Sequence, residues 1–140
     1  MSWKKLLLRV NAIIPSTEDV IKSPKDFVPD VLSKAIEGEG VAIEWEYFRD
    51  WEDYDDCDIR AKVLGEKQNL INSFYVVDER VFSEDIEPHL ILGEELFQFI
   101  DGYFDSNGVC FFNGDVIVVS KDEPLIFIFH HEGAYSWVKM

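Results

Sequence analysis

The chain has 140 residues, of which 47% are hydrophobic and 14% aromatic, and this size and composition fit one folded domain, residues 1–140, with its own core. Thirteen basic residues against 28 acidic ones give a net charge of −15. So negative a field repels phosphates, which argues against direct binding of nucleic acid or of an anionic membrane. It favours solubility and basic protein partners.

The cysteines and the N-terminus bear on the compartment. Cys57 and Cys110 form no CxxC pair, so we expect free thiols in a reducing cytoplasm rather than a disulfide framework. The opening MSWKKLLLRVNAII resembles a signal peptide for only three leucines before Arg9 and Asn11 interrupt the apolar run. No apolar stretch reaches the roughly 18 residues that a membrane helix needs. The sequence therefore predicts a cytoplasmic protein without a membrane segment.

In the first half of the chain, the spacing of apolar residues predicts one helix among several strands. Residues 6–13 alternate in polarity and predict a strand. Residues 27–36 carry apolar side chains at helical spacing and predict a helix. Residues 41–48 alternate again, as a half-buried strand does. A return strand is expected at 59–63 and a further strand at 71–77.

The second half is more strand-like. Apolar residues from 92 to 103 recur at helical spacing and predict a helix. Strands at 109–112, with Cys110 in the core, and at 116–119 are expected to flank an Asn-Gly hairpin turn. Residues 125–129 are apolar on both faces, as in a central strand.

A last strand at 135–138 is expected to pair at an edge, and we find no repeat, linker or domain boundary in the sequence. The elements together predict an α+β domain: a mostly antiparallel β-sheet with about two to three helices packed on one side.

The most unusual stretch is residues 44–58, EWEYFRDWEDYDDCD, in which eight of fifteen residues are acidic and five are aromatic. Strand alternation places Trp45 and Tyr47 toward the core, whereas Trp51 and Tyr54 lie beyond the strand. Exposed tyrosine and tryptophan are typical anchors of protein interfaces, and surrounding carboxylates steer a basic partner. The alternative is that all five aromatics are core and the acids form a solvent-facing loop.

We interpret this stretch as a surface that binds a basic protein. The residues expected to contact the partner are Glu44, Glu46, Asp50, Trp51, Glu52, Asp53, Tyr54, Asp55, Asp56 and Asp58.

Catalytic and metal-binding patterns are weak. Residues 53–58 fail as a calcium loop because Cys57 takes a ligand position and Asp58 the glycine position. The cluster His130-His131-Glu132 is the most enzyme-like feature, with Asp101 as a further candidate. Adjacent residues in a strand point to opposite faces, so a pair of turn histidines is the simpler interpretation. We therefore expect no metal, no cofactor and no enzymatic activity.

In size, charge and its EWEYFRDWEDYDDCD surface, the chain resembles the immunity proteins of bacterial toxin systems, which include colicin-type proteins and those of contact-dependent growth inhibition. The resemblance implies a toxin inhibitor that captures a basic toxin domain, often a nuclease, by steric and electrostatic means. It implies no particular fold and no residue roles.

Three classes of function stay open. The first is an immunity protein, with a nucleic-acid mimic as its close neighbour. The second is a small hydrolase or metal-dependent enzyme that uses His130, His131 and Glu132. The third is a regulatory module with a basic partner unrelated to toxins. The oligomeric state and the identity of the partner do not follow from the sequence.

Overall fold

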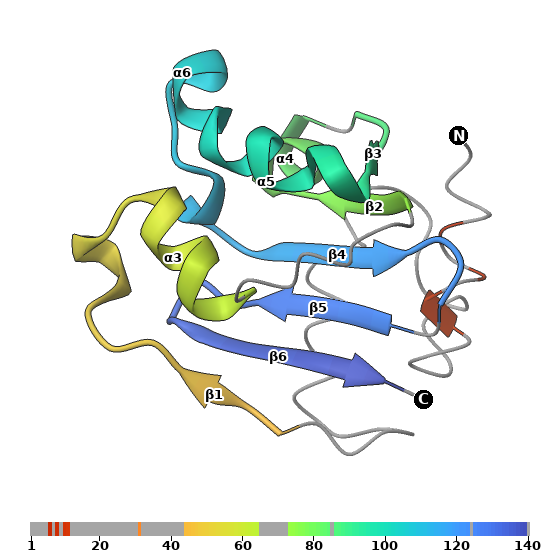
Figure 1. Ribbon diagram of the computed structural model, residues 1–140, viewed down its shortest axis with the longest axis horizontal. Coiled ribbons are helices and arrows are strands. Elements are labelled where there is room, and N and C mark those ends of the chain that lie inside the picture. Colours follow the sequence, from red (N-terminus) through yellow and green to blue (C-terminus); the bar gives the residue numbers. More distant parts are fainter. Residues whose placement is uncertain are drawn as a thin grey trace.

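The computed structural model describes residues 6, 8, 10, 11, 31, 44–64, 73–84, 86–123 and 125–139. These residues form a six-stranded antiparallel sheet with helices packed on it (Figure 1). The strand order is β1-β6-β5-β4-β2-β3. The strands are β1 (Glu46–Tyr47), β2 (Ser73–Val77), β3 (His89–Leu92), β4 (Val116–Ser120), β5 (Leu125–Phe129) and β6 (Ala134–Lys139). The α+β fold with an antiparallel sheet is confirmed.

The helical elements pack around this sheet. They are the short 3-10 helices η1 (Trp51–Asp53) and η2 (Phe111–Asn113), and the helices α3 (Asp56–Val63), α4 (Glu79–Glu84), α5 (Gly93–Asp101) and α6 (Tyr103–Asn107). Because β2, β4 and β5 are apolar on both sides, the sheet can be covered on both faces.

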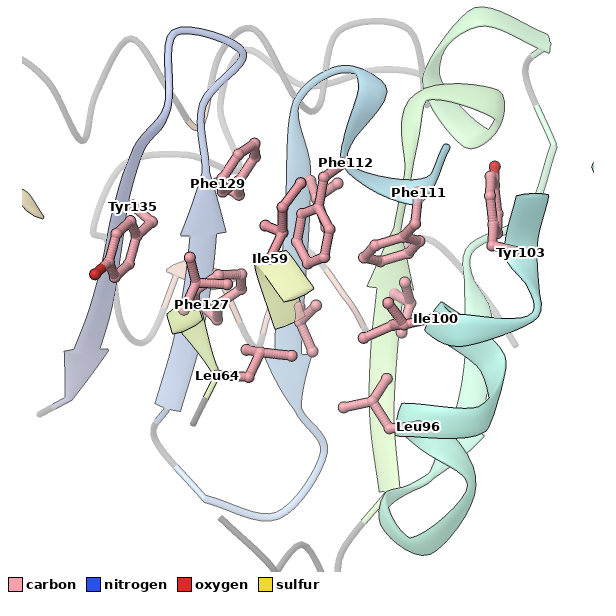
Figure 2. Packing of buried hydrophobic residues seen from close by; sticks show 14 of the residues in the cluster. Ile59, Leu64, Leu96, Ile100, Tyr103, Phe111, Phe112, Phe127, Phe129 and Tyr135 are labelled. Atoms are coloured by element: carbon pink, nitrogen blue, oxygen red, sulfur yellow. The ribbon is translucent and has the colours of Figure 1, made fainter. Parts of the chain in front are cut away.

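One face of the sheet is covered by α3, α5, α6 and η2. Figure 2 shows Ile59 and Leu64 of the α3 region and Leu96 and Ile100 of α5 pointing at the sheet, with Phe127 of β5 beneath them. The aromatic rings of Tyr103, Phe111, Phe112 and Phe129 form a chain of edge contacts along this core, with centroids 4.9–5.4 Å apart.

The opposite face buries Val77 of β2, Ile117 of β4 and Ile128 of β5 against further apolar residues. Val81 of α4 lies there, together with the helical residues Leu6, Val10 and Val31. Helical residues therefore contact both faces, whereas the sequence led us to expect helices on one side.

The strand predicted at residues 6–13 is wrong where the structure describes it. Leu6, Leu8 and Val10 are helical. Leu6 and Val10 are fully buried, but Leu8 is 54% exposed, which is the i, i+4 pattern of a helix face. Of the helix predicted at 27–36, Val31 is helical and buried, and the other positions lie outside the described residues.

The return strand predicted at 59–63 is also wrong, because these residues belong to α3. Ile59 and Val63 are both buried and are four residues apart, the spacing of residues on one face of a helix. The alternation of Ile59, Ala61 and Val63 is therefore consistent with a helix as well as with a strand. Charge favours the helix too, since acidic residues occupy its first turn and Arg60 and Lys62 its last turn, each near the end of the helix dipole that it complements.

The predicted Asn-Gly hairpin does not form. Residues 111–113 are the 3-10 helix η2, and Gly114 is extended rather than left-handed, so the backbone lacks the two positive φ angles of that turn. Cys110 is exposed instead of buried. The strand at 116–119 is correct, but its hairpin partner is β5.

The remaining predictions are confirmed in outline. β2 falls within residues 71–77, and β5 is an interior strand with both faces buried. The helix predicted from 92 to 103 begins at Gly93, after Leu92 ends β3, and it is interrupted at Gly102. The strand predicted at 135–138 is β6, but it is interior and not at an edge, because β1 pairs with its outer side. Of the strand predicted at 41–48, the described residues 44–48 form the two-residue β1.

Candidate functional site

The acidic aromatic stretch lies at one end of the sheet, at left in Figure 1, where β5 turns into β6. The chain leaves β1, turns at Arg49 and Asp50, forms η1, and enters α3 at Asp56. Asp50 adopts the left-handed conformation, with φ of 56°, which aspartate tolerates better than most residues. The stretch is therefore largely turn and helix.

Trp51 and Phe48 fix this segment to the β5–β6 turn. The Trp51 ring packs edge-on against Phe129, with centroids 5.5 Å apart. The Phe48 N–H donates to the carbonyl of Gly133 at 2.9 Å. The Trp51 ring also lies against Gly133, where an added Cβ would be 2.5 Å from Trp51 Cδ1. Trp51 is thus half-buried and serves chiefly to anchor the segment.

Strand alternation assigned Tyr47 to the core, and this is wrong: Tyr47 is 70% exposed. Among the described residues of the acidic aromatic stretch, Glu46 and Tyr47 are the two that pair with β6, and their strand β1 is at the edge of the sheet. Trp45 is half-buried against the opposite-face core, as expected. Tyr54 is 48% exposed and packs one side of its ring against Phe48, with centroids 5.1 Å apart.

Seven carboxylates of the stretch are exposed, and we call them the acidic surface: Glu44, Glu46, Asp50, Glu52, Asp53, Asp55 and Asp58. Exposed Tyr47 and Tyr54 lie among them in the chain. Glu46 also accepts a hydrogen bond from the hydroxyl of Tyr135. The segment is therefore a charged surface with two accessible aromatic rings.

Asp56 differs from its neighbours because it is only 6% exposed. Its carboxylate accepts the N–H of Phe111 at 2.6 Å and the N–H of Phe112 at 3.1 Å. Burial raises the pKa of Asp56, and the two hydrogen bonds only partly oppose that effect. Its carboxylate holds η2 against the start of α3, so we leave Asp56 out of the contact surface.

Two hollows open beside the acidic surface. One, of about 450 Å³, is lined by Asp55, Asp56, Cys57, Asp101, Phe104, Asp105 and Cys110. The other, of about 410 Å³, is lined by Trp51, Glu52, Tyr54, Ile59, Cys110, Phe112, Asn113 and His131. Cys110 lines both, so an acidic hollow and an aromatic hollow adjoin.

No pattern in the sequence indicated that the segment around Asp101 joins this surface. Helix α3 packs on α5, and Arg60 of α3 bonds both oxygens of Asp101, at 2.8 and 3.0 Å. The Arg60 guanidinium also lies 4.5 Å from the centre of the Phe97 ring. This contact aligns α5 and α6 with α3, which brings Asp101 and Asp105 beside Asp55.

His130, His131 and Glu132 form the turn between β5 and β6, as the simpler interpretation expected. The imidazoles of His130 and His131 nevertheless lie together, with centroids 4.1 Å apart. Strand alternation does not apply here because the chain reverses direction: the Gly133 N–H donates to the His130 carbonyl, and the His130 N–H to the Ala134 carbonyl. His131 is close to Asp115.

His89 belongs to a different environment, on β3 at the far edge of the sheet. Its Nε2 lies 3.2 Å from Oδ2 of Asp78, which is fully buried. Burial raises the pKa of Asp78, but His89, the Tyr103 hydroxyl and the Val81 N–H outweigh burial and lower it overall. The Val81 bond also caps the start of α4.

Comparisons of the chain with protein-family models, curated proteins and solved structures found no match. Among the helices formed by the described residues, none has the length and apolar character needed to cross a membrane.

Proposed function

We propose that this protein is a cytoplasmic immunity protein that binds and neutralises a basic toxin domain, a nuclease in the first instance, through its acidic surface. The observation that carries the proposal is the set of seven exposed carboxylates with Tyr47 and Tyr54 on one short segment. Inhibition of this kind needs no catalytic group, because covering an active site is sufficient. The exposed free thiols of Cys57 and Cys110 suit a reducing cytoplasm.

Electrostatics favours a cationic partner. Two exposed carboxylates about 6 Å apart repel by only ~0.7 kcal/mol in water, a cost that a domain with about 5–15 kcal/mol of net stability tolerates. Lysines and arginines of a partner would turn this repulsion into attraction and would speed association. Carboxylates set in a basic groove can take the positions of substrate phosphates.

Rigidity supports the same function. The segment is fixed by Trp51 on Phe129, by the hydrogen bond from Phe48 to Gly133, and by Asp56 under η2. A surface that is ordered before binding loses less conformational entropy in the complex. The acidic hollow bounded by Asp55, Asp101 and Asp105 has room for a basic side chain.

The test begins with capture of a partner from the source lysate. The partner is identified by mass, expressed, and assayed for nuclease activity against titrated inhibitor. A variant with Asp50, Asp53, Asp55 and Asp58 changed to Asn removes four charges without touching Asp56. The matched control removes four charges elsewhere, from Glu87, Glu94, Glu95 and Asp122, which are all exposed.

We expect the wild type and the control to inhibit stoichiometrically. The four-Asn variant should associate tenfold or more slowly at low salt, with a flatter dependence on salt, because steering is an ionic effect. Equal inhibition by the variant and the wild type would show that this surface is not the interface. A captured partner without toxin activity would instead favour a regulatory module.

A further inference from the structure

The turn between β5 and β6 brings together three side chains that metals bind. Asp115, His130 and His131 each offer one ligand atom, and these three atoms lie within 4.8 Å of one another. Strand register explains the meeting: Val116 of β4 pairs with Phe129 of β5, so Asp115, just before β4, lies opposite His130, just after β5.

Hydrogen bonds already hold this group in place. The backbone N–H of His131 donates to Oδ1 of Asp115 at 2.9 Å, and Nδ1 of His131 lies 2.9 Å from the same oxygen. The Glu132 N–H donates to Nδ1 of His130 at 3.1 Å. Backbone N–H groups thus position the Asp115 carboxylate and the His130 ring, and the Asp115 carboxylate positions the His131 ring. A neutral imidazole has one nitrogen lone pair, so the hydrogen bond from Glu132 to His130 must give way when that ring binds an ion.

We propose that Asp115, His130 and His131 bind one zinc ion. Two imidazoles and a carboxylate are the ligands that zinc takes in three-residue sites that keep an open position. Ligand atoms at 2.0–2.2 Å from a tetrahedral zinc stand roughly 3.3–3.6 Å apart. The ligand atoms now lie within 4.8 Å of one another, and we expect side-chain rotation to bring them to that spacing. Magnesium and calcium prefer sites made wholly of oxygen ligands, so they are poor candidates.

The surroundings are compatible with entry of an ion. The His131 side chain is 56% exposed and that of Asp115 is 19% exposed, so solvent reaches the site. His130 lines a hollow of about 250 Å³ beside Tyr47, and His131 lines the aromatic hollow beside Trp51. A net charge of −15 raises the local concentration of cations. The zinc site would lie next to the acidic surface but does not depend on its function.

The first experiment uses the untagged wild-type protein, freed of metal by chelation and titrated with zinc in a calorimeter. We expect one zinc per chain. The His131→Ala and Asp115→Asn variants should each bind tenfold or more weakly, because each removes a ligand. Asp122→Asn, an exposed acid in the β4–β5 turn, should bind as the wild type does. Acidification should weaken binding because protons compete for the imidazoles.

Two further measurements make the result decisive. The first is NMR of the histidine rings in the wild type, which does not depend on any variant folding. Zinc should shift the ring signals of His130 and His131 and leave those of His89 unchanged. The four-Asn variant keeps all three ligands, so its zinc affinity should stay within a few-fold of the wild type, and excess magnesium should not displace the ion. No binding, displacement by magnesium, loss of binding in the four-Asn variant, or unchanged binding in both ligand variants would overturn the proposal.

Discussion

Among the glycines of the described turns, Gly133 should tolerate substitution least, because both its backbone conformation and its close neighbours require the absence of a side chain. Its φ of +90° is left-handed, and a Cβ would lie 2.5 Å from Trp51 Cδ1 and 2.8 Å from the carbonyl oxygen of Phe48. Contacts under 3.0 Å force something to shift. In Gly133→Ala the shift must move either the turn or the segment that carries the acidic surface.

The magnitude follows from what the shift breaks. A left-handed alanine costs about 1–2 kcal/mol. Weakening the Trp51–Phe129 ring contact costs about 0.5–1.5 kcal/mol, and loss of the hydrogen bond from Phe48 costs a similar amount. We expect the free energy of unfolding to fall by about 2–5 kcal/mol. With an unfolding entropy of about 2.1 cal/mol/K per residue, Tm should fall by roughly 7–17 °C.

Gly108 supplies a matched control. Its φ is +77°, but nothing lies within 4 Å of the position of an added Cβ. Gly108→Ala should therefore cost only the backbone term, about 1–2 kcal/mol. Both variants are compared with the wild type by urea denaturation and by thermal melting followed by circular dichroism. Equal losses in the two variants would refute the close packing of Trp51 and Phe48 against the β5–β6 turn.

Two buried carboxylates give further predictions. Asp56→Ala should lower the free energy of unfolding by about 2 kcal/mol or more, because two backbone N–H groups lose their acceptor. Urea denaturation measures this loss, and unchanged stability would contradict the role assigned to Asp56. The folded pKa of Asp78 lies below its usual 3.8, so its carboxylate stabilises the fold above pH 3.8, and this stabilisation is lost as the pH falls through the folded pKa. In Asp78→Asn, which keeps a cap for α4, the stability curve should flatten below pH 3.8; a curve parallel to that of the wild type would argue against the Asp78–His89 interaction.

Several features could be predicted from the sequence because they depend on local patterns. The continuous apolar run at 125–129 predicted an interior strand, since only a strand covered on both faces tolerates such a run. Helical spacing from 92 to 103 was long enough to identify α5. The charge and aromatic content of residues 44–58 marked the surface stretch without any structural information.

Secondary-structure prediction failed for short segments in which the apolar residues fit both the period of a strand and that of a helix. Leu6 and Val10, like Ile59 and Val63, are four residues apart and buried on one helix face, yet alternating residues between and beside them suggested strands. Over so few residues, the choice between helix and strand depends on which side chains meet the core. The hairpin turn predicted at Asn113-Gly114 does not form because another tertiary contact intervenes: Asp56 holds the preceding backbone in η2.

Composition, together with the spacing of apolar and acidic residues along the chain, was enough to indicate an acidic α+β domain with one concentrated charged segment. Only the tertiary structure decided which of those charges face solvent: it buries Asp56 under η2, and it brings Asp101 and Asp105 beside Asp55 through the packing of α3 on α5. It likewise places Asp115 beside His130 and His131 through the register of β4 and β5. Such meetings join residues far apart in the chain, and their positions are set by packing and strand pairing rather than by local sequence.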